Sequence, residues 1–105
     1  MALIRALNDK LRIDHRGGQI VATVGVTSRG PYFVALALGL IRDFSAFSPA
    51  NDPYDEHDFG SISLDNVTVF WKIDYYDQSL SAGADDPSDS AKCTRILTVM
   101  LADEY

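Results

Sequence analysis

The residue types best suited to chemistry are concentrated in one short acidic segment, residues 51–58. Within eight residues it holds four carboxylates and one imidazole, from Asp52, Asp55, Glu56, His57 and Asp58. Hard cations bind carboxylate oxygens, and a transition metal would also accept the imidazole. The spacing matches no EF-hand loop, and no second histidine lies nearby. A solvated acidic loop, whose Asp and Asn side chains hold turns, is therefore the simpler interpretation.

His57 and Asp58 also have the composition of an acid–base pair, with Tyr75 and Tyr76 as further candidates. Neighbouring residues on an extended chain point to opposite faces, so the first two side chains should not orient each other. The chain also lacks a G-x-S-x-G sequence, a phosphate-binding glycine loop and zinc-site spacing. We therefore predict no catalytic residue and no cofactor. A small metal-dependent or acid–base enzyme centred on residues 52–58 is kept as an alternative.

A further candidate is the aromatic segment 67–76, whose side chains alternate in the manner of a strand. The set expected to face the core is Val67, Val69, Trp71, Ile73 and Tyr75. The set expected to face outward is Thr68, Phe70, Lys72, Asp74 and Tyr76. Because aromatic residues dominate binding hot spots, Phe70 and Tyr76 beside acidic residues would suit a basic, apolar groove on a partner.

The charge of the chain is concentrated in its middle. The formal net charge is −6, whereas residues 51–89 carry ten carboxylates against Lys72 alone, a net charge of −9. Nucleic acids bind through Lys and Arg side chains that neutralise phosphates, so nucleic acid is not expected as a direct ligand. The acidic middle instead suits a basic partner, although acidity by itself also keeps a small protein soluble.

Hydrophobic periodicity indicates the elements that must position these groups. We predict helices over residues 2–13 and 31–44, a strand over 19–27, and a hairpin of strands 58–64 and 67–76 with Asp65-Asn66 at its turn. A last helix should begin near residues 88–90, and polar loops cover 48–57 and 77–89. The helix over 31–44 is apolar on nearly every side and should be deeply buried.

These elements predict one α+β domain over residues 1–105. With 47% hydrophobic residues, a chain of this length can bury a core. The order helix, strand, helix, strand, strand, helix favours a two-layer sandwich, with three helices and a three-stranded, mainly antiparallel sheet. Strand order and oligomeric state are left open. In one interpretation the apolar second helix packs against a second copy, and the protein is a structural homo-oligomer.

The remaining special residues are expected to be structural. Cys93 is the only cysteine, and it should be buried on the inner face of the last helix as a small hydrophobe. His15 should be solvated at a helix end. The first residues lack the leader of a signal peptide, and the longest apolar run, 33–41, is too short for a membrane span. A cytoplasmic protein without membrane contact is therefore expected.

Several segments resemble one small family. They are NDP at 51–53, EHDFG at 56–60, FWKIDYYD at 70–77, TRILTVMLADEY at 94–105 and IRALND at 4–9. They resemble an uncharacterised bacterial domain-of-unknown-function family, mostly alphaproteobacterial and often carried on plasmids and phages. The resemblance covers most of the chain and supplies no catalytic residue. It implies an accessory role for a mobile element, which includes blocking host defence.

Charge, aromatic residues and resemblance together predict a non-enzymatic, acidic protein-interaction module. It would occupy a basic, nucleic-acid-binding surface of a partner, as an anti-CRISPR-like inhibitor would. Its contacts would come from the two acidic loops and from the outward face of the strand over 67–76. The predicted partner-binding residues are Asp52, Asp55, Glu56, Asp58, Phe70, Asp74, Tyr76, Asp77, Asp85, Asp86 and Asp89.

Overall fold

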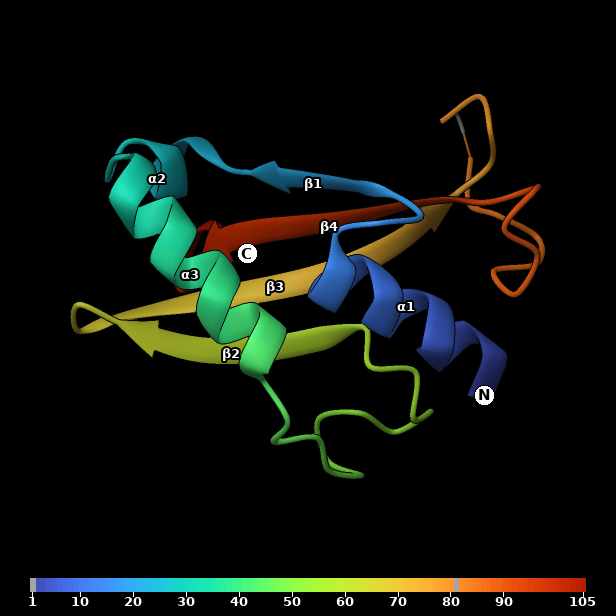
Figure 1. The fold of residues 1–105 in the computed structure, drawn as a ribbon, viewed down its shortest axis with the longest axis horizontal. Helices are drawn as coiled ribbons and strands as arrows, with labels where there is room; N and C mark the ends of the chain where they lie inside the picture. The colour runs from blue at the N-terminus through green and yellow to red at the C-terminus, as the bar shows by residue number, and fades with distance from the viewer. Residues whose placement is uncertain (1, 81) are drawn as a thin grey trace.

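A computed structural model describes residues 2–80 and 82–105 of the chain (Figure 1). The elements are α1 (Ala2–Asp14), β1 (Gln19–Ala22), α2 (Val24–Thr27), α3 (Pro31–Asp43), β2 (Phe59–Leu64), β3 (Val67–Tyr76), β4 (Thr94–Leu101) and the 3-10 helix η1 (Ala102–Glu104). None of the helices in the described residues is long and apolar enough to cross a membrane.

The strands form one mixed sheet in the order β1-β4-β3-β2. β1 runs parallel to β4, whereas the pairs β3–β4 and β2–β3 are antiparallel. Helices α1 and α3 pack on the same face of this sheet (Figure 1). The predicted α+β class is therefore confirmed, but the predicted three-stranded sheet is wrong in detail, because a fourth strand lies in its centre.

The predicted hairpin is confirmed as β2 and β3. Its turn residues Asp65 and Asn66 both adopt the left-handed conformation, with φ of 53° and 63°, as a tight two-residue turn requires. The predicted inner face of β3 is also confirmed, since Val69, Trp71 and Ile73 are buried while the alternate residues are not. The alternation of apolar and polar types therefore determined which face of β3 meets the helices.

The predicted last helix is wrong, because residues 94–101 form β4. Arg95, Leu97 and Val99 are buried on the helix-covered face, opposite Tyr75, Ile73 and Trp71 of β3. The apolar residues of this segment fit a helical period as well as a strand period, so periodicity alone was ambiguous. Residues 94–101 form a strand because β1 and β3 lie on either side and supply partners for the backbone hydrogen bonds.

The predicted strand over residues 19–27 is also too long. Pairing with β4 stops at Ala22, and Val24–Thr27 turn into the short helix α2. The carboxylate of Glu104 accepts hydrogen bonds from Thr23 Oγ1 at 2.6 Å and from the backbone nitrogen of Gly25 at 3.0 Å. These bonds hold the turn, and they join residues 81 and 79 positions apart, which local propensity could not anticipate.

Helix α3 is less buried than predicted. Phe33, Ala37 and Ile41 face the sheet and are buried, but Leu36 and Leu40 remain 39% and 40% exposed. The sheet lies on one side of this helix only, and no second layer covers its outer side within the described residues (Figure 1). The apolar residues on its outer side are therefore not evidence that the whole helix is buried.

The core is centred on Trp71, which is fully buried and packs edge-on against Phe44 and Phe47. The indole lies directly over Gly60 of β2. A Cβ added at Gly60 would sit 2.3 Å from Trp71 Nε1, so no side chain fits there.

Gly60→Ala should therefore lower the free energy of unfolding by roughly 1–3 kcal/mol, the usual cost of overpacking a core. Gly39→Ala is the matched control, because its Cβ would meet nothing closer than 3.9 Å and helix propensity should stabilise it slightly. Chemical denaturation of both variants measures the difference. Equal stabilities would contradict the tight contact between Trp71 and Gly60.

Candidate functional site

The candidate site lies beneath helix α1, whose inner side is unexpectedly polar. In the sequence pattern Asn8 and Arg12 lie outside the apolar stripe of Leu3, Ile4, Leu7 and Leu11. The structure instead buries Asn8 and Arg12 beside Ile4 and Leu11, while Leu3 is exposed. Because these four buried residues recur at i, i+4, i+7 and i+8, they share one face of the helix.

Arg12 caps the end of α3. Its Nη1 donates to the backbone carbonyls of Ile41, Arg42 and Phe44 at 2.9–3.0 Å, and its Nη2 to the carboxylate of Asp9 at 2.9 Å. A cation at a helix C-terminus satisfies the last carbonyls and opposes the helix dipole. Arg12 therefore fixes where α3 ends and the acidic segment 44–58 begins.

A second polar network joins α1 to the sheet. Arg95 is 1% exposed and donates from Nε to Asn8 Oδ1 at 2.8 Å. Asn8 Nδ2 donates to Tyr75 Oη at 2.8 Å and to the backbone carbonyl of Glu56 at 3.0 Å. The Tyr75 hydroxyl in turn donates to Glu56 Oε1 at 2.9 Å. Burial is the main cause that raises the pKa of Tyr75, so this hydroxyl stays a neutral donor.

His57 lies between carboxylates from two parts of the chain. Its Nδ1 is 3.0 Å from Asp9 Oδ1 on α1, and its Nε2 faces Asp52 Oδ2 at 3.7 Å and Asp55 Oδ1 at 3.6 Å. Its ring stacks on Phe47 with centroids 3.7 Å apart and an angle of 1° between the ring planes. The imidazole side chain is 19% exposed. Among the described residues no hydrogen bond or ion pair joins Asp58 to His57, which has φ of 55° and precedes β2.

The segment 44–58 is ordered by its own side chains. Asp52 is 6% exposed and accepts hydrogen bonds from the backbone nitrogens of Glu56 and His57. Asn51 bridges Ser48 and Ala46, and Asp55 pairs with Arg5 on α1. Asp52 therefore holds the loop in shape. Its burial removes it from the set of predicted partner contacts, because a partner's side chain would not reach it.

The second acidic loop is also hydrogen-bonded into a defined shape over residues 77–80 and 82–93, the part that the structure describes. Asp86 accepts hydrogen bonds from the hydroxyl and the backbone nitrogen of Ser88, and these two bonds, the hydroxyl bond first, lower the pKa of Asp86. Asp89 accepts a hydrogen bond from the backbone nitrogen of Ala91. Arg95 Nη2 donates to the carbonyl of Pro87 and anchors the loop to the core. A hollow of about 360 Å³ is lined by Asp77, Ala82, Gly83, Asp85, Asp86 and Lys92. Three acidic residues and one lysine therefore line it.

The predicted outward face of β3 forms part of a sheet face that no helix covers in the described residues (Figure 1). Phe70 is partly buried, and its ring centroid lies 5.3 Å from that of Phe59 and 5.7 Å from that of Tyr105. Tyr76 is also partly buried, and Lys72 pairs with Asp74 at 2.9 Å. The sequence identified Phe70 and Tyr76 but not the neighbouring rings of Phe59 and Tyr105.

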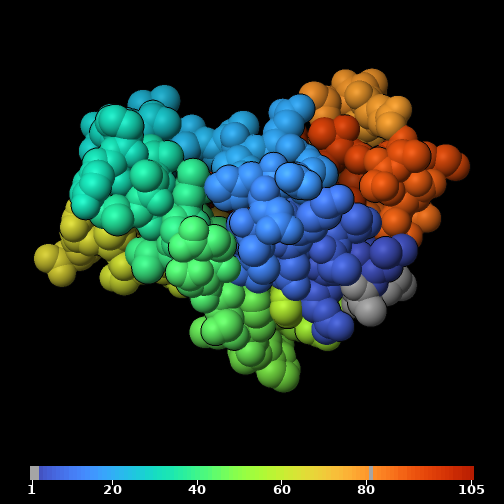
Figure 2. Space-filling view, in the orientation of Figure 1, coloured from blue at the N-terminus to red at the C-terminus, as the bar shows by residue number. Residues whose placement is uncertain are grey.

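The two acidic loops do not form one patch in the view of Figure 2, where α1 lies between residues 44–58 and residues 77–93. Of the predicted contacts, Asp55, Asp85 and Asp86 are exposed. The partly buried ones are Glu56, Asp58, Phe70, Asp74, Tyr76, Asp77 and Asp89. The loop at 77–89 therefore offers more accessible carboxylates than the loop at 51–58. Separately, burial, followed by the charge of Glu56, raises the pKa of Asp58.

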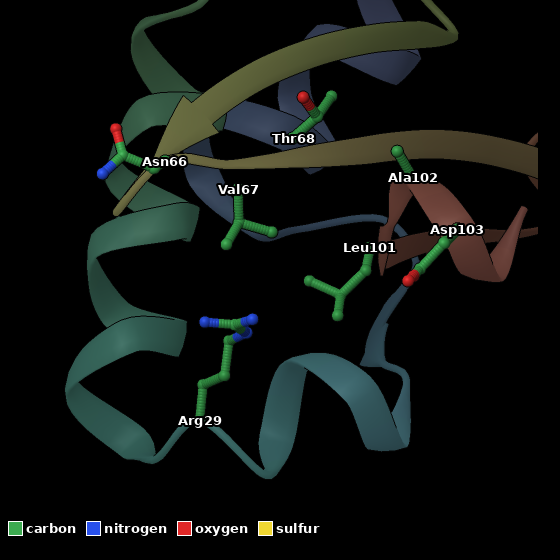
Figure 3. Close-up of a pocket in the computed structure, with 7 residues that line it drawn as sticks. All are labelled: Arg29, Asn66, Val67, Thr68, Leu101, Ala102 and Asp103. Carbon is green, nitrogen blue, oxygen red and sulfur yellow. The ribbon is translucent and has the colours of Figure 1, made fainter.

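A further hollow lies at the opposite end of the sheet (Figure 3). It measures about 360 Å³, and its lining residues are Arg29, Asn66, Val67, Thr68, Leu101, Ala102 and Asp103. The guanidinium of Arg29 points into it and also lies 5.3 Å from the ring centre of Phe33. Because Arg29 and Asp103 carry opposite charges, this hollow favours neither acidic nor basic ligands, and it is a weaker candidate for a binding site.

Comparison with protein families places the chain. The profile of a family described as a protein of unknown function, DUF3768, matches residues 22–104. The chain belongs to this family. Comparison with curated proteins and with solved structures gave no match.

The DUF3768 match covers only part of the polar site beneath α1. It includes His57, Tyr75 and Arg95, whereas α1 with Asn8 and Asp9 lies before its first residue. The sequence did not point to Asn8, Asp9 and Arg95, because a hydrophobicity pattern does not distinguish a buried polar residue from a solvated one. The signal that could have found them is their spacing, since Asn8 and Arg12 continue the Ile4 and Leu11 face. Cys93 is buried as predicted, but it lies directly before β4 and not on a helix, and burial raises the pKa of its thiol.

Proposed function

We propose that this DUF3768 protein is a non-enzymatic interaction module that binds a basic protein surface through the loop at 77–89. The observation that carries the proposal is the hollow that Asp77, Asp85 and Asp86 line. A Lys or Arg side chain of a partner is complementary in charge to such a hollow.

The order of the loop supports this proposal. A flexible acidic segment would lose conformational entropy on binding, whereas carboxylates that are already positioned lose less. The hydrogen bonds at Asp86 and Asp89, and the anchor from Arg95 to Pro87, hold the loop before any partner arrives. The affinity for a basic groove should therefore depend on the shape of the loop as well as on its charge.

The adjoining sheet face extends the proposed surface. The loop leaves β3 directly after Tyr76, and Asp74 and Phe70 lie on the same outward face of that strand. Acidic groups at one end and aromatic rings along the strand suit a partner groove that is basic and partly apolar. The proposed contacts are Phe70, Asp74, Tyr76, Asp77, Asp85, Asp86 and Asp89, with Asp55, Glu56 and Asp58 on the separate loop at 51–58.

The finer proposal concerns the identity of the partner. The resemblance to mobile-element proteins and the shortage of accessible basic side chains in 51–89 favour a partner that normally holds nucleic acid. In this proposal the carboxylates take the place of phosphates on that partner's basic surface, and the protein acts as an anti-CRISPR-like inhibitor of host defence.

Retention of cell proteins on the immobilised chain, at low and at high salt, tests both the proposed binding to a basic surface and the proposed identity of the partner. We expect salt-sensitive capture of a nucleic-acid-binding complex and its release by competing DNA or RNA. Asp85→Lys with Asp86→Lys should weaken this capture by at least about tenfold, because like charges would then meet across the interface.

The matched control carries the same charge change elsewhere. Asp14→Lys with Asp103→Lys alters two exposed carboxylates, on α1 and on η1, and should leave the capture nearly unchanged. Equal losses in the two double variants would show that only net charge matters and would refute the specific surface. Capture that persists in the Asp85/Asp86 variant would refute the proposal as a whole.

A further inference from the structure

The imidazole of His57 is held in the orientation that a metal ligand needs. Its Nδ1 lies 3.0 and 3.1 Å from the two carboxylate oxygens of Asp9, so in the neutral ring the Nδ1 proton is donated to Asp9. The lone pair of the neutral ring is then on Nε2. Metal-binding histidines are typically oriented by a carboxylate on the opposite ring nitrogen in this way. The stacking of the ring on Phe47 fixes its plane as well.

Two carboxylate oxygens face that lone pair. Asp55 Oδ1 is 3.6 Å and Asp52 Oδ2 is 3.7 Å from His57 Nε2, distances too long for hydrogen bonds. One ligand atom from each residue lies within 4.8 Å of the others. The separations are close to the roughly 3.4 Å that two ligands of a tetrahedral zinc ion adopt with bonds of about 2.0–2.1 Å.

The other oxygen of each carboxylate is already occupied. Asp52 Oδ1 accepts the backbone N–H groups of Glu56 and His57 at 3.1 and 3.2 Å, with a longer contact of 3.3 Å from His57 N to Oδ2. Asp55 Oδ2 pairs with Arg5. These bonds orient both carboxylates so that Asp52 Oδ2 and Asp55 Oδ1 are directed toward His57 Nε2.

We propose that His57, Asp52 and Asp55 bind one zinc ion, with Asp9 as the residue that positions His57. An imidazole with two carboxylates suits zinc better than calcium or magnesium, which prefer oxygen ligands alone. Asp52 and Asp55 also line a hollow of about 250 Å³ together with Phe47, Ser48, Pro49 and Pro53. The site is independent of the proposed partner surface at 77–89.

Zinc titration of the untagged full chain tests this inference, read both by calorimetry and by the midpoint of thermal unfolding. We expect one zinc ion per chain and a midpoint that rises with zinc concentration, because a ligand that binds only the folded state stabilises it. Loss of a residue that merely positions a ligand costs about 10–100-fold in metal affinity. His57→Ala should therefore weaken zinc binding by more than about 100-fold, and Asp55→Asn, which lies at the exposed edge, by at least about tenfold.

Matched controls separate a built site from general attraction to an acidic surface. His15→Ala removes the other histidine, which is exposed, and Asp85→Asn removes an exposed carboxylate in the other loop, and both should bind zinc like the parent. Asp55→Asn keeps the test valid even if His57→Ala fails to fold. Equal zinc affinity in the Asp55 and Asp85 variants would overturn the proposal. So would a chain that binds no zinc.

Discussion

Replacing Arg12 by methionine should lower the free energy of unfolding by about 3–5 kcal/mol, the typical result of removing one partner of a buried ion pair. Methionine keeps most of the apolar volume but cannot donate. The carbonyls of Ile41, Arg42 and Phe44 and the carboxylate of Asp9 would each lose a hydrogen bond. The guanidinium also lies 5.4 and 5.6 Å from the ring centres of Phe47 and Trp71, and that attraction would be lost too. Denaturation in urea measures the change.

Arg42→Met is the natural control for this prediction. Arg42 lies at the same end of α3 but is exposed and pairs with its neighbour Asp43. An exposed pair of this kind contributes little, so the unfolding midpoint of this variant should stay close to that of the parent chain. If both variants lost the same stability, the hydrogen bonds of the buried Arg12 would contribute no more than an exposed ion pair, which would contradict the prediction.

Replacing Arg95 by methionine should cost a similar amount, about 3 kcal/mol, because one buried and one partly buried acceptor would be left without a donor. They are Asn8 Oδ1 on α1 and the Pro87 carbonyl in the loop at 77–93. The loop should also open locally, so amide hydrogen exchange in residues 85–92 should accelerate more than the loss of global stability requires. Lys92→Met, an exposed change in the same loop, should leave both measurements nearly unchanged.

A double-mutant cycle makes the Arg95 prediction sharper. Asn8→Leu removes the acceptor that Arg95 satisfies, so Asn8→Leu together with Arg95→Met should cost less than the sum of the two single changes. Simple additivity would mean that the two side chains do not share a hydrogen bond in solution. The cycle also bears on function, because a loop released from Arg95 should bind a basic partner more weakly than the ordered loop.

Buried polar networks mark the main difference between what the pattern indicated and what the fold contains. The hairpin, the helix at the N-terminus and α3 were predictable, because each is specified by local periodicity and turn chemistry. The acidic loop around His57 was recognisable as a candidate from composition alone. The role of Asp9 was not, because it lies 48 positions from His57 and meets it only when α1 packs on the sheet.

The last element shows why periodicity has a limit. Residues 94–101 carry apolar side chains that satisfy both a helical and a strand period, and the segment becomes a strand because β1 and β3 pair with it on both sides. That pairing also explains the burial of Arg95, which the helix prediction did not foresee. Long-range backbone pairing therefore decided a question that the local sequence left open.

By itself the sequence determined the α+β class, the hairpin register, the inner face of β3 and the uneven distribution of charge. These properties follow from neighbouring residues, whose spacing along the chain equals their spacing on a helix or strand. Only the tertiary structure decided which carboxylates are accessible, which polar residues are buried and which groups surround His57. The burial of Asn8 and Arg95 and the pairing of Asp9 with His57 depend on contacts between residues 48 to 87 positions apart, and such contacts form only when α1, the acidic loops and the sheet are packed together.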